Sequence, residues 1–240
     1  MIRNELYNIV NNLVRKAGFD IRRFPTRDQR MLIKYLEDNK VQDCFDVGAN
    51  TGQYAQLLRS MGFKGKIFSF EPQAKAFERL SKKASGNSKW AVHNIGLGDL
   101  DCKSVINVSK NSVSSSFLDI NPLLTDVAPE TNYVSREEIQ VHKVDTFIKE
   151  TGFNNRLFLK IDAQGFESKI LAGAEEYFHK IYALQLELAC VSLYSGETLF
   201  DEMKLSIESK GFYLSSLESG FADIKTGRLL QVEAVFLREL

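Results

Sequence analysis

The sequence has 240 residues, of which 44% are hydrophobic and 26% are charged, and its formal net charge is +0. This length and composition fit one large soluble globular domain, and the balanced charge argues against a nucleic-acid partner. No apolar run approaches the roughly 20 residues that a membrane-spanning helix needs, and the first residues lack the apolar core of a secretory signal. The three cysteines (Cys44, Cys102 and Cys190) lack metal-like spacing. Cys44 and Cys190 are expected to be buried free thiols, and the expected compartment is the cytoplasm.

The first 40 residues are expected to form a helical cap on a domain that covers residues 41–240. An apolar stripe with helical period runs from Leu6 to Ala17, and a second helical pattern covers residues 31–36. Basic residues end the first helix and follow it: Arg15, Lys16, Arg22 and Arg23. One interpretation is a solvated helix end that the macrodipole favours; the other is contact with an anionic substrate or a peripheral membrane contact.

From residue 41 onward, apolar strand-like runs alternate with amphipathic helical runs. This alternation predicts an α/β fold with a mostly parallel sheet and helices on both faces. Strands are expected at 41–47, 66–71, 90–94, 157–162 and 181–188, followed by an antiparallel pair at 212–217 and 232–237. Gly96, Gly98 and Asp99 predict a turn. Two more strands, around 105–108 and 139–144, flank a long polar loop with four serines, and such loops are often functional.

The turn after the first of these strands, Asp46-Val47-Gly48-Ala49-Asn50-Thr51-Gly52, is typical of a ligand-binding turn. It precedes a helix, whose N-terminus offers unpaired N–H groups to a ligand. Its G-x-x-x-G spacing differs from the G-x-G-x-x-G of dinucleotide sites, and Asp46 would repel a pyrophosphate but attract a cation or an amine. The turn therefore predicts a nucleoside-like ligand without a phosphate at that point, such as S-adenosylmethionine. The alternative is an ordinary tight turn of an α/β protein.

Polar side chains end the other predicted strands, where ligands bind in open α/β sheets. Glu71 is placed to hold ribose hydroxyls, although an NAD enzyme would also use such an acid. Asn94 is a candidate for the adenine edge or for a simple turn. Asp162 ends the fourth strand and faces the predicted crevice, and Glu187 ends the fifth near the same edge.

Three further residues of the fourth strand and its surroundings have open interpretations. Lys160 shares a face with Asp162 by the period of two, so we expect an ion pair with Asp162 or Glu187. Glu167 is expected to favour a helix N-terminus rather than to act in catalysis. His93 and His142 lie in strand-like runs and are interpreted as packed side chains.

Several motifs in this order resemble the FkbM-type methyltransferase family. They are the turn at 46–52, Phe70-Glu71-Pro72, the run 94–99, the serine cluster, Leu159-Lys160-Ile161-Asp162-Ala163-Gln164-Gly165-Phe166-Glu167, and Leu186-Glu187-Leu188. The resemblance covers roughly residue 41 to the C-terminus. It implies the Rossmann-like class I methyltransferase fold with a seven-stranded sheet, S-adenosylmethionine as methyl donor, and usually a hydroxyl oxygen as acceptor.

The resemblance also implies roles for single residues. Asp46, Gly48, Asn50 and Gly52 would line the methionine end of the donor, Glu71 its ribose and Asn94 its adenine, with Asp162 beside the reacting methyl. We add Thr51 and Tyr54, in and next to the glycine turn, to the predicted donor site, and Ser114, Ser115 and Lys160 as candidates for substrate contact. Members of this family often have Glu at the position of Gln164, so a role that depends on that carboxylate is not assigned to this chain.

The sequence thus predicts an O-methyltransferase that acts on a hydroxyl of a sugar, in a glycan or a glycolipid intermediate. Asp162 is the first candidate to accept the hydroxyl proton and Glu187 is the second. No acidic cluster predicts a metal site. The alternatives are an NAD(P)-dependent oxidoreductase on a similar sheet and a non-catalytic nucleotide-binding protein.

Overall fold

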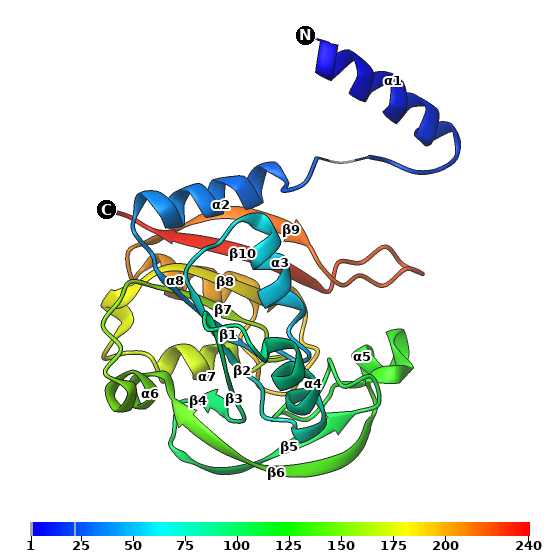
Figure 1. Ribbon diagram of the computed structural model, residues 1–240. Coiled ribbons are helices and arrows are strands. Elements are labelled where there is room, and N and C mark those ends of the chain that lie inside the picture. The colour runs from blue at the N-terminus through cyan, green and yellow to red at the C-terminus, as the bar shows by residue number, and fades with distance from the viewer. Residues whose placement is uncertain (1, 22) are drawn as a thin grey trace.

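The computed structural model describes residues 2–21 and 23–240, so the predicted basic residue Arg22 lies outside the described residues (Figure 1). Its main sheet has seven strands in the order β3-β2-β1-β7-β8-β10-β9, and β10 runs antiparallel to its two neighbours. The strands are β1 (Asp43–Val47), β2 (Lys66–Phe70), β3 (Trp90–His93), β7 (Leu157–Ile161), β8 (Ile181–Ala189), β9 (Phe212–Ser219) and β10 (Gln231–Arg238). The predicted seven-stranded, mostly parallel sheet is confirmed.

Helices cover both faces of this sheet because successive strand residues point to opposite sides. Cys44 of β1 packs into an apolar cluster with α2 (Arg27–Asp38), α3 (Gln53–Met61) and α4 (Ala74–Ala84). The next residue, Phe45, packs into the larger cluster on the opposite face, with α6 (Val144–Thr151), α7 (Glu167–Ala172) and α8 (Phe200–Glu208). The two faces of the sheet therefore have separate apolar cores. Figure 1 shows helices on both faces.

A second sheet of three strands, in the order β4-β6-β5, lies below the main one in Figure 1. It consists of β4 (Gly96–Gly98), β5 (Cys102–Ser109) and β6 (Tyr133–Lys143), and α5 (Pro122–Val127) lies in the connection between β5 and β6. The prediction of a turn is wrong for Gly96 and Gly98, because Gly96–Gly98 pairs in parallel with β6, whereas Asp99 lies in a bend after the strand. Val144 is also not a strand residue: β6 ends at Lys143, whose backbone N–H donates to Asp101, and Val144 begins α6.

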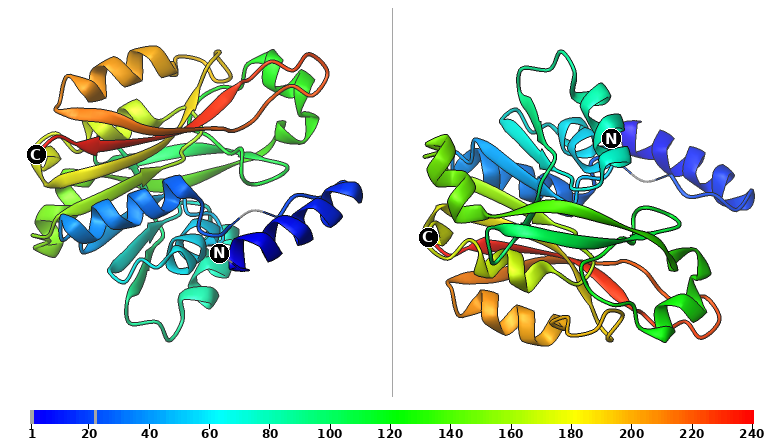
Figure 2. Two further views of the ribbon diagram at one scale, coloured as in Figure 1. Left: turned by 90° about the horizontal axis from the view of Figure 1, so that it is seen from above. Right: turned by 90° about the horizontal axis from the view of Figure 1, so that it is seen from below.

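The two N-terminal helices differ in how they relate to the sheet. A capping box between Thr26 and Gln29 begins α2, which packs on the sheet through Leu32, Ile33 and Leu36. The first helix, α1 (Ile2–Lys16), stands apart from the sheet in the views of Figures 1 and 2. Only α2 therefore covers the sheet as the predicted cap would. Within the described part of the chain, no helix is long and apolar enough to cross a membrane.

Candidate active site

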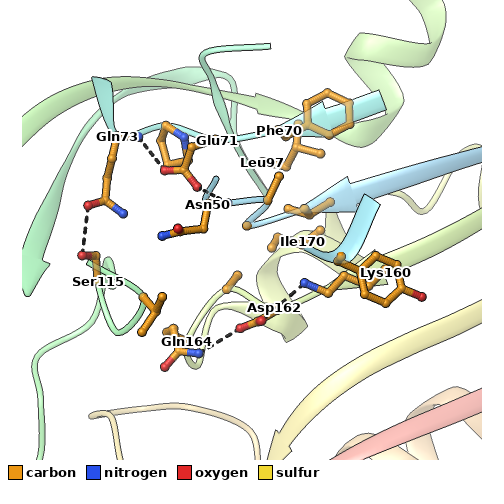
Figure 3. A pocket seen from close by; sticks show the side chains of 18 of the residues that line it. Asn50, Phe70, Glu71, Gln73, Leu97, Ser115, Lys160, Asp162, Gln164 and Ile170 are labelled. Carbon is orange, nitrogen blue, oxygen red and sulfur yellow. Dashed lines mark hydrogen bonds and ion pairs between the residues drawn. The ribbon is translucent and has the colours of Figure 1, made fainter. Parts of the chain in front are cut away.

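A cavity of about 330 Å³ opens at the carboxyl ends of β1, β2 and β7 (Figure 3). This volume lies at the lower end of the range of about 300–1,000 Å³ that is usual for ligand sites. One part of its wall is polar, with Asn50, Glu71 and Gln73. Apolar side chains form much of the remainder (Phe70, Ile95, Leu97, Ile106, Phe117 and Ile170), and Lys160, Asp162, Gln164 and Glu233 form a charged and polar end.

The glycine turn after β1 allows two chain segments to approach each other closely. Gly48 has φ +74°, and a Cβ atom there would lie 1.8 Å from the carbonyl oxygen of Asp162. The Asp162 N–H in turn donates to the Val47 carbonyl at 3.1 Å. Gly52 has φ +83°, and a Cβ atom there would lie 2.7 Å from the Trp90 ring. Both positions thus require glycine for conformation and packing, and Gly48 also lines the cavity.

Glu71 follows β2 and is buried, with both carboxylate oxygens held by the backbone. Its Oε2 accepts the N–H of Asn50 and its Oε1 accepts the N–H of Gln73, each at 2.8 Å. Burial raises the pKa of Glu71 to about 7, although these two hydrogen bonds oppose the shift. Asn94 donates from Nδ2 to the carbonyls of Glu71 and Pro72, both at 2.9 Å, and so fixes the chain where it leaves β2.

The serine loop between β5 and α5 lies over the polar part of the cavity. Gln73 donates to the Ser112 carbonyl at 3.1 Å and accepts from the Ser115 hydroxyl at 3.2 Å. Ser112, Val113 and Ser115 line the cavity. Ser114 lies outside its lining, and its hydroxyl accepts from the Asn111 amide at 2.9 Å. One residue of the predicted serine pair is therefore positioned to face a ligand.

A row of polar side chains crosses the sheet beside the cavity. Ser69, Asp46, Lys160 and Gln185 are register partners on β2, β1, β7 and β8, so they project from the same face. Asp46 is fully buried; its Oδ2 accepts from the Ser69 hydroxyl at 3.0 Å, and its Oδ1 lies 3.8 Å from the ammonium of Lys160. Asp46 does not line the cavity, whereas Lys160 does.

The predicted ion pair of Lys160 is confirmed, with Asp162 as its partner. Lys160 Nζ lies 3.4 Å from Asp162 Oδ2. Burial by itself would lower the pKa of Lys160, but the carboxylates of Asp162 and Asp46 together raise it above its ordinary value. Lys160 therefore remains a cation, which makes it unsuited to accept a proton from a substrate.

Gln164 connects the two acids that the sequence proposed for catalysis. It has φ +54°, and its Nε2 donates to Asp162 Oδ1 at 2.9 Å and to Glu187 Oε2 at 2.7 Å. The Tyr194 hydroxyl donates to Gln164 Oε1 at 2.8 Å, which fixes the amide with its NH₂ group toward the carboxylates. Figure 3 shows Gln164 and Asp162 joined in this way at the cavity.

Glu187 itself is not part of the cavity lining. Its Oε2 also accepts from the amide of Gln231 at 2.9 Å. Burial, together with the charges of Asp162 and Glu233, raises the pKa of Glu187 well above its ordinary value. Glu187 thus lies behind Asp162 and contacts it through Gln164.

The predicted site residues divide into those that line the cavity and those that support it. Gly48, Asn50, Tyr54, Glu71, Ser115, Lys160 and Asp162 line it, whereas Asp46, Thr51, Gly52, Asn94, Ser114 and Glu187 do not. The roles assigned to all of these residues stay predictions. The sequence reasoning missed Gln73, Leu97, Phe117, Gln164, Ile170 and Glu233 as lining residues. Gln73 could have been predicted as a lining residue, because it follows a strand end, two positions after Glu71. Glu233 is on the last strand, far along the chain, and no local pattern in the sequence indicates it.

The residues around the cavity fit S-adenosylmethionine. Glu71 and the neighbouring amides of Asn50 and Gln73 provide acceptors and donors for hydroxyl and amine groups, and the apolar wall suits an adenine ring. Lys160 is the one cationic side chain among the described residues that line the cavity, and the acids Asp46, Asp162 and Glu233 accompany it. Because formal negative charge exceeds positive charge at this end, a ligand with a sulfonium and an ammonium is favoured there.

Comparison with known proteins identifies the family to which the chain belongs. The sequence model of the methyltransferase FkbM domain matches residues 46–214. The chain is also similar to the 2-O-methyltransferase NoeI of Sinorhizobium fredii (strain NBRC 101917 / NGR234), at 20% identity over 161 residues. This alignment covers 63% of the chain and 65% of NoeI, so the chain spans slightly less than two thirds of that relative.

Two solved structures are similar over most of the chain, each at 10% identity. An rRNA methylase from Streptococcus thermophilus aligns over 91% of this chain and 100% of its own, with a TM-score of 0.48. A protein of the NADB-Rossmann superfamily from Streptococcus agalactiae aligns over 92% of this chain and 71% of its own, with a TM-score of 0.47. The family match covers well over half of the sequence, and the predicted sheet is present. The chain therefore belongs to the FkbM methyltransferase family and has the class I methyltransferase fold.

Proposed function

We propose that this protein transfers a methyl group from S-adenosylmethionine to a hydroxyl oxygen of a sugar, in a glycan or a glycolipid intermediate. The observation that carries the proposal is the environment of Asp162. Its carboxylate lies on the cavity wall, with one oxygen held by the Gln164 amide and the other near the ammonium of Lys160. A carboxylate held in this way is suited to orient an acceptor hydroxyl and to receive its proton.

S-adenosylmethionine supplies a methyl group that its sulfonium has already activated. The protein therefore has to bind and align the two substrates, which can contribute roughly 7–11 kcal/mol in favourable cases. In our proposal, Glu71 and the amides beside it hold the donor's nucleoside part. Asp162 takes the hydroxyl proton as the carbon–oxygen bond forms and the methyl–sulfur bond breaks, which leaves neutral S-adenosylhomocysteine. Lys160 compensates the charge of Asp162 before that proton arrives.

The choice of a sugar hydroxyl has two supports. The curated relative is named a 2-O-methyltransferase, which makes an oxygen acceptor the natural proposal for this chain. The cavity wall also has amide and hydroxyl side chains from four different segments, namely Gln53, Gln73, Ser115 and Gln164. Such groups can both donate to and accept from the hydroxyls of a sugar.

The test is Asp162→Asn, assayed by transfer of labelled methyl to a panel of glycans and glycolipids, with mass spectrometry of the products. We expect methyl transfer to fall by about 10²- to 10⁴-fold, the usual contribution of a general base. Calorimetric titration with S-adenosylhomocysteine should show that affinity for the donor site changes far less. Asp126→Asn is the matched control, because Asp126 is exposed on α5, away from the cavity.

Three outcomes would contradict parts of the proposal. Near-normal turnover would remove Asp162 as the proton acceptor. An equal loss of turnover and of affinity would mean that Asp162 serves donor binding alone. Binding of NAD in place of the methyl donor would favour the oxidoreductase alternative, against which the family match already argues.

A further inference from the structure

The described part of the N-terminal arm, which we define as α1 together with segment 17–26, has an unusual surface. Six of the 17 exposed large apolar side chains of the described residues lie within the first 24 positions. Leu13 is 61% exposed, Phe19 is 69% exposed and Phe24 is 54% exposed. Val10 and Leu13, three positions apart on α1, share a face of the helix. Exposed apolar groups concentrated in so short a segment indicate a surface that another body covers.

The arm is folded as a unit, although it stands off the sheet. The segment after α1 turns back along the helix: the Tyr7 hydroxyl donates to the Ile21 carbonyl at 2.7 Å, and the Ile21 N–H donates to Asn11 Oδ1 at 2.8 Å. Arg15 forms an ion pair with Asp20 at 2.8 Å across the same turn. The exposed side chains of α1 and of the returning segment therefore belong to one small surface.

Charge distinguishes the arm from the remainder of the molecule. Residues 1–30 contain seven Lys or Arg and three Asp or Glu, a formal charge of +4, so the other 210 residues carry −4 in a chain that is neutral overall. Lys16, Arg23, Arg27 and Arg30 are all exposed. An amphipathic helix that combines basic and apolar side chains is typical of segments that lie in the surface of an anionic membrane. Two copies of the arm would repel each other, which disfavours a second chain as the covering body.

The arm also leaves the body at the edge that holds the cavity. Since α2 runs along the sheet to the start of β1, its first residue, Arg27, lies toward the carboxyl ends of the parallel strands. The left view of Figure 2 shows α1 projecting on the same side as the hairpin that joins β9 to β10, which lies at that edge. A surface that binds the arm would therefore lie next to the opening of the active site.

We propose that the N-terminal arm binds the surface of an anionic lipid bilayer and holds the cavity edge beside it. The apolar side chains of the arm insert among the lipids, and its basic side chains contact the headgroups. The inference does not rest on the proposed methyl transfer, because it concerns residues outside the cavity.

The test is sedimentation of the full chain with vesicles of phosphatidylcholine, with and without phosphatidylglycerol. We expect binding to the vesicles that contain phosphatidylglycerol and loss of that binding at high salt. Leu13→Glu with Phe19→Glu should abolish sedimentation. Lys16→Glu with Arg23→Glu should lower partitioning at least about 25-fold, because each basic residue near such a surface contributes about fivefold.

The matched controls are Leu205→Glu and Lys64→Glu, which alter exposed residues on the body of the protein. These two variants should bind the vesicles as the wild type does. Retained affinity for S-adenosylhomocysteine shows that each variant is folded. The proposal is overturned if the wild type does not sediment with anionic vesicles, or if arm and body variants behave alike. It is also overturned if the Leu13 variant converts a dimer to a monomer in analytical ultracentrifugation, since a second chain would then cover the arm.

Discussion

Replacement of Gln164 by Glu tests the internal arrangement of the active site most directly. The Gln164 amide donates to Asp162 at 2.9 Å and to Glu187 at 2.7 Å. The Glu variant has nearly the same shape but exchanges this shared donor for a third carboxylate. An oxygen then faces two carboxylate oxygens at hydrogen-bond distance, which requires that at least one proton be bound.

The magnitude follows from these distances. Two charges with centres about 4 Å apart repel by about 4 kcal/mol at an effective dielectric constant of 20, which corresponds to about 3 pKa units. Glu187 already has a raised pKa because of its burial and the nearby acids Asp162 and Glu233. Other charges nearby also influence these acids, namely those of Asp46, Lys160 and Glu167, and the Lys160 cation offsets part of the repulsion. We therefore expect the acidic limb of the activity profile to move about 2–3 units toward higher pH.

The assay is the pH dependence of kcat/KM for methyl transfer in Gln164→Glu, compared with the wild type and with Gln56→Glu. Gln56 is exposed on α3 and does not line the cavity, so its variant controls for the added charge. Tyr194→Phe should give a smaller loss of activity, because the Gln164 amide would no longer be held by the Tyr194 hydroxyl. An unchanged pH profile in Gln164→Glu would refute the view that this amide sets the charge state around Asp162.

Two further predictions concern donor affinity and stability. Glu71→Gln should weaken binding of S-adenosylhomocysteine by roughly 10- to 150-fold, the effect of about 1.5–3 kcal/mol for a lost charge-assisted hydrogen bond. Because the pKa of Glu71 is about 7, the wild type should bind S-adenosylhomocysteine fully above pH 7 and more weakly at lower pH. Titrations on both sides of pH 7 should show no such change in the variant. His93 packs against Phe70 and Phe147, and burial lowers its pKa. Protonation in the folded state is therefore unfavourable, and stability should fall as the pH drops below the ordinary value of 6.5. His93→Phe should reduce that fall in thermal unfolding experiments, whereas the exposed His179→Phe should not; parallel curves for both variants would contradict the assignment.

The sequence by itself determined the features that depend on local order along the chain. The alternation of strands and helices predicted the main sheet, and the glycine turn and strand-end acids marked the edge that holds the cavity. The period of two placed Lys160 and Asp162 on one face, and their ion pair at 3.4 Å confirms it. Local patterns failed at Gly96–Gly98, where pairing with β6 overrides the preference of glycine for turns.

Only the tertiary structure decided which side chains reach the cavity, because this depends on strand register and on contacts between distant segments. Register places Asp46 in a buried row with Ser69 and Lys160, beneath the cavity that it was predicted to line. The last strand brings Glu233 to the cavity from more than 70 positions after Asp162. Gln164 has a left-handed backbone, and its amide contacts one acid just after β7 and another on β8, a geometry that no spacing in the sequence specifies.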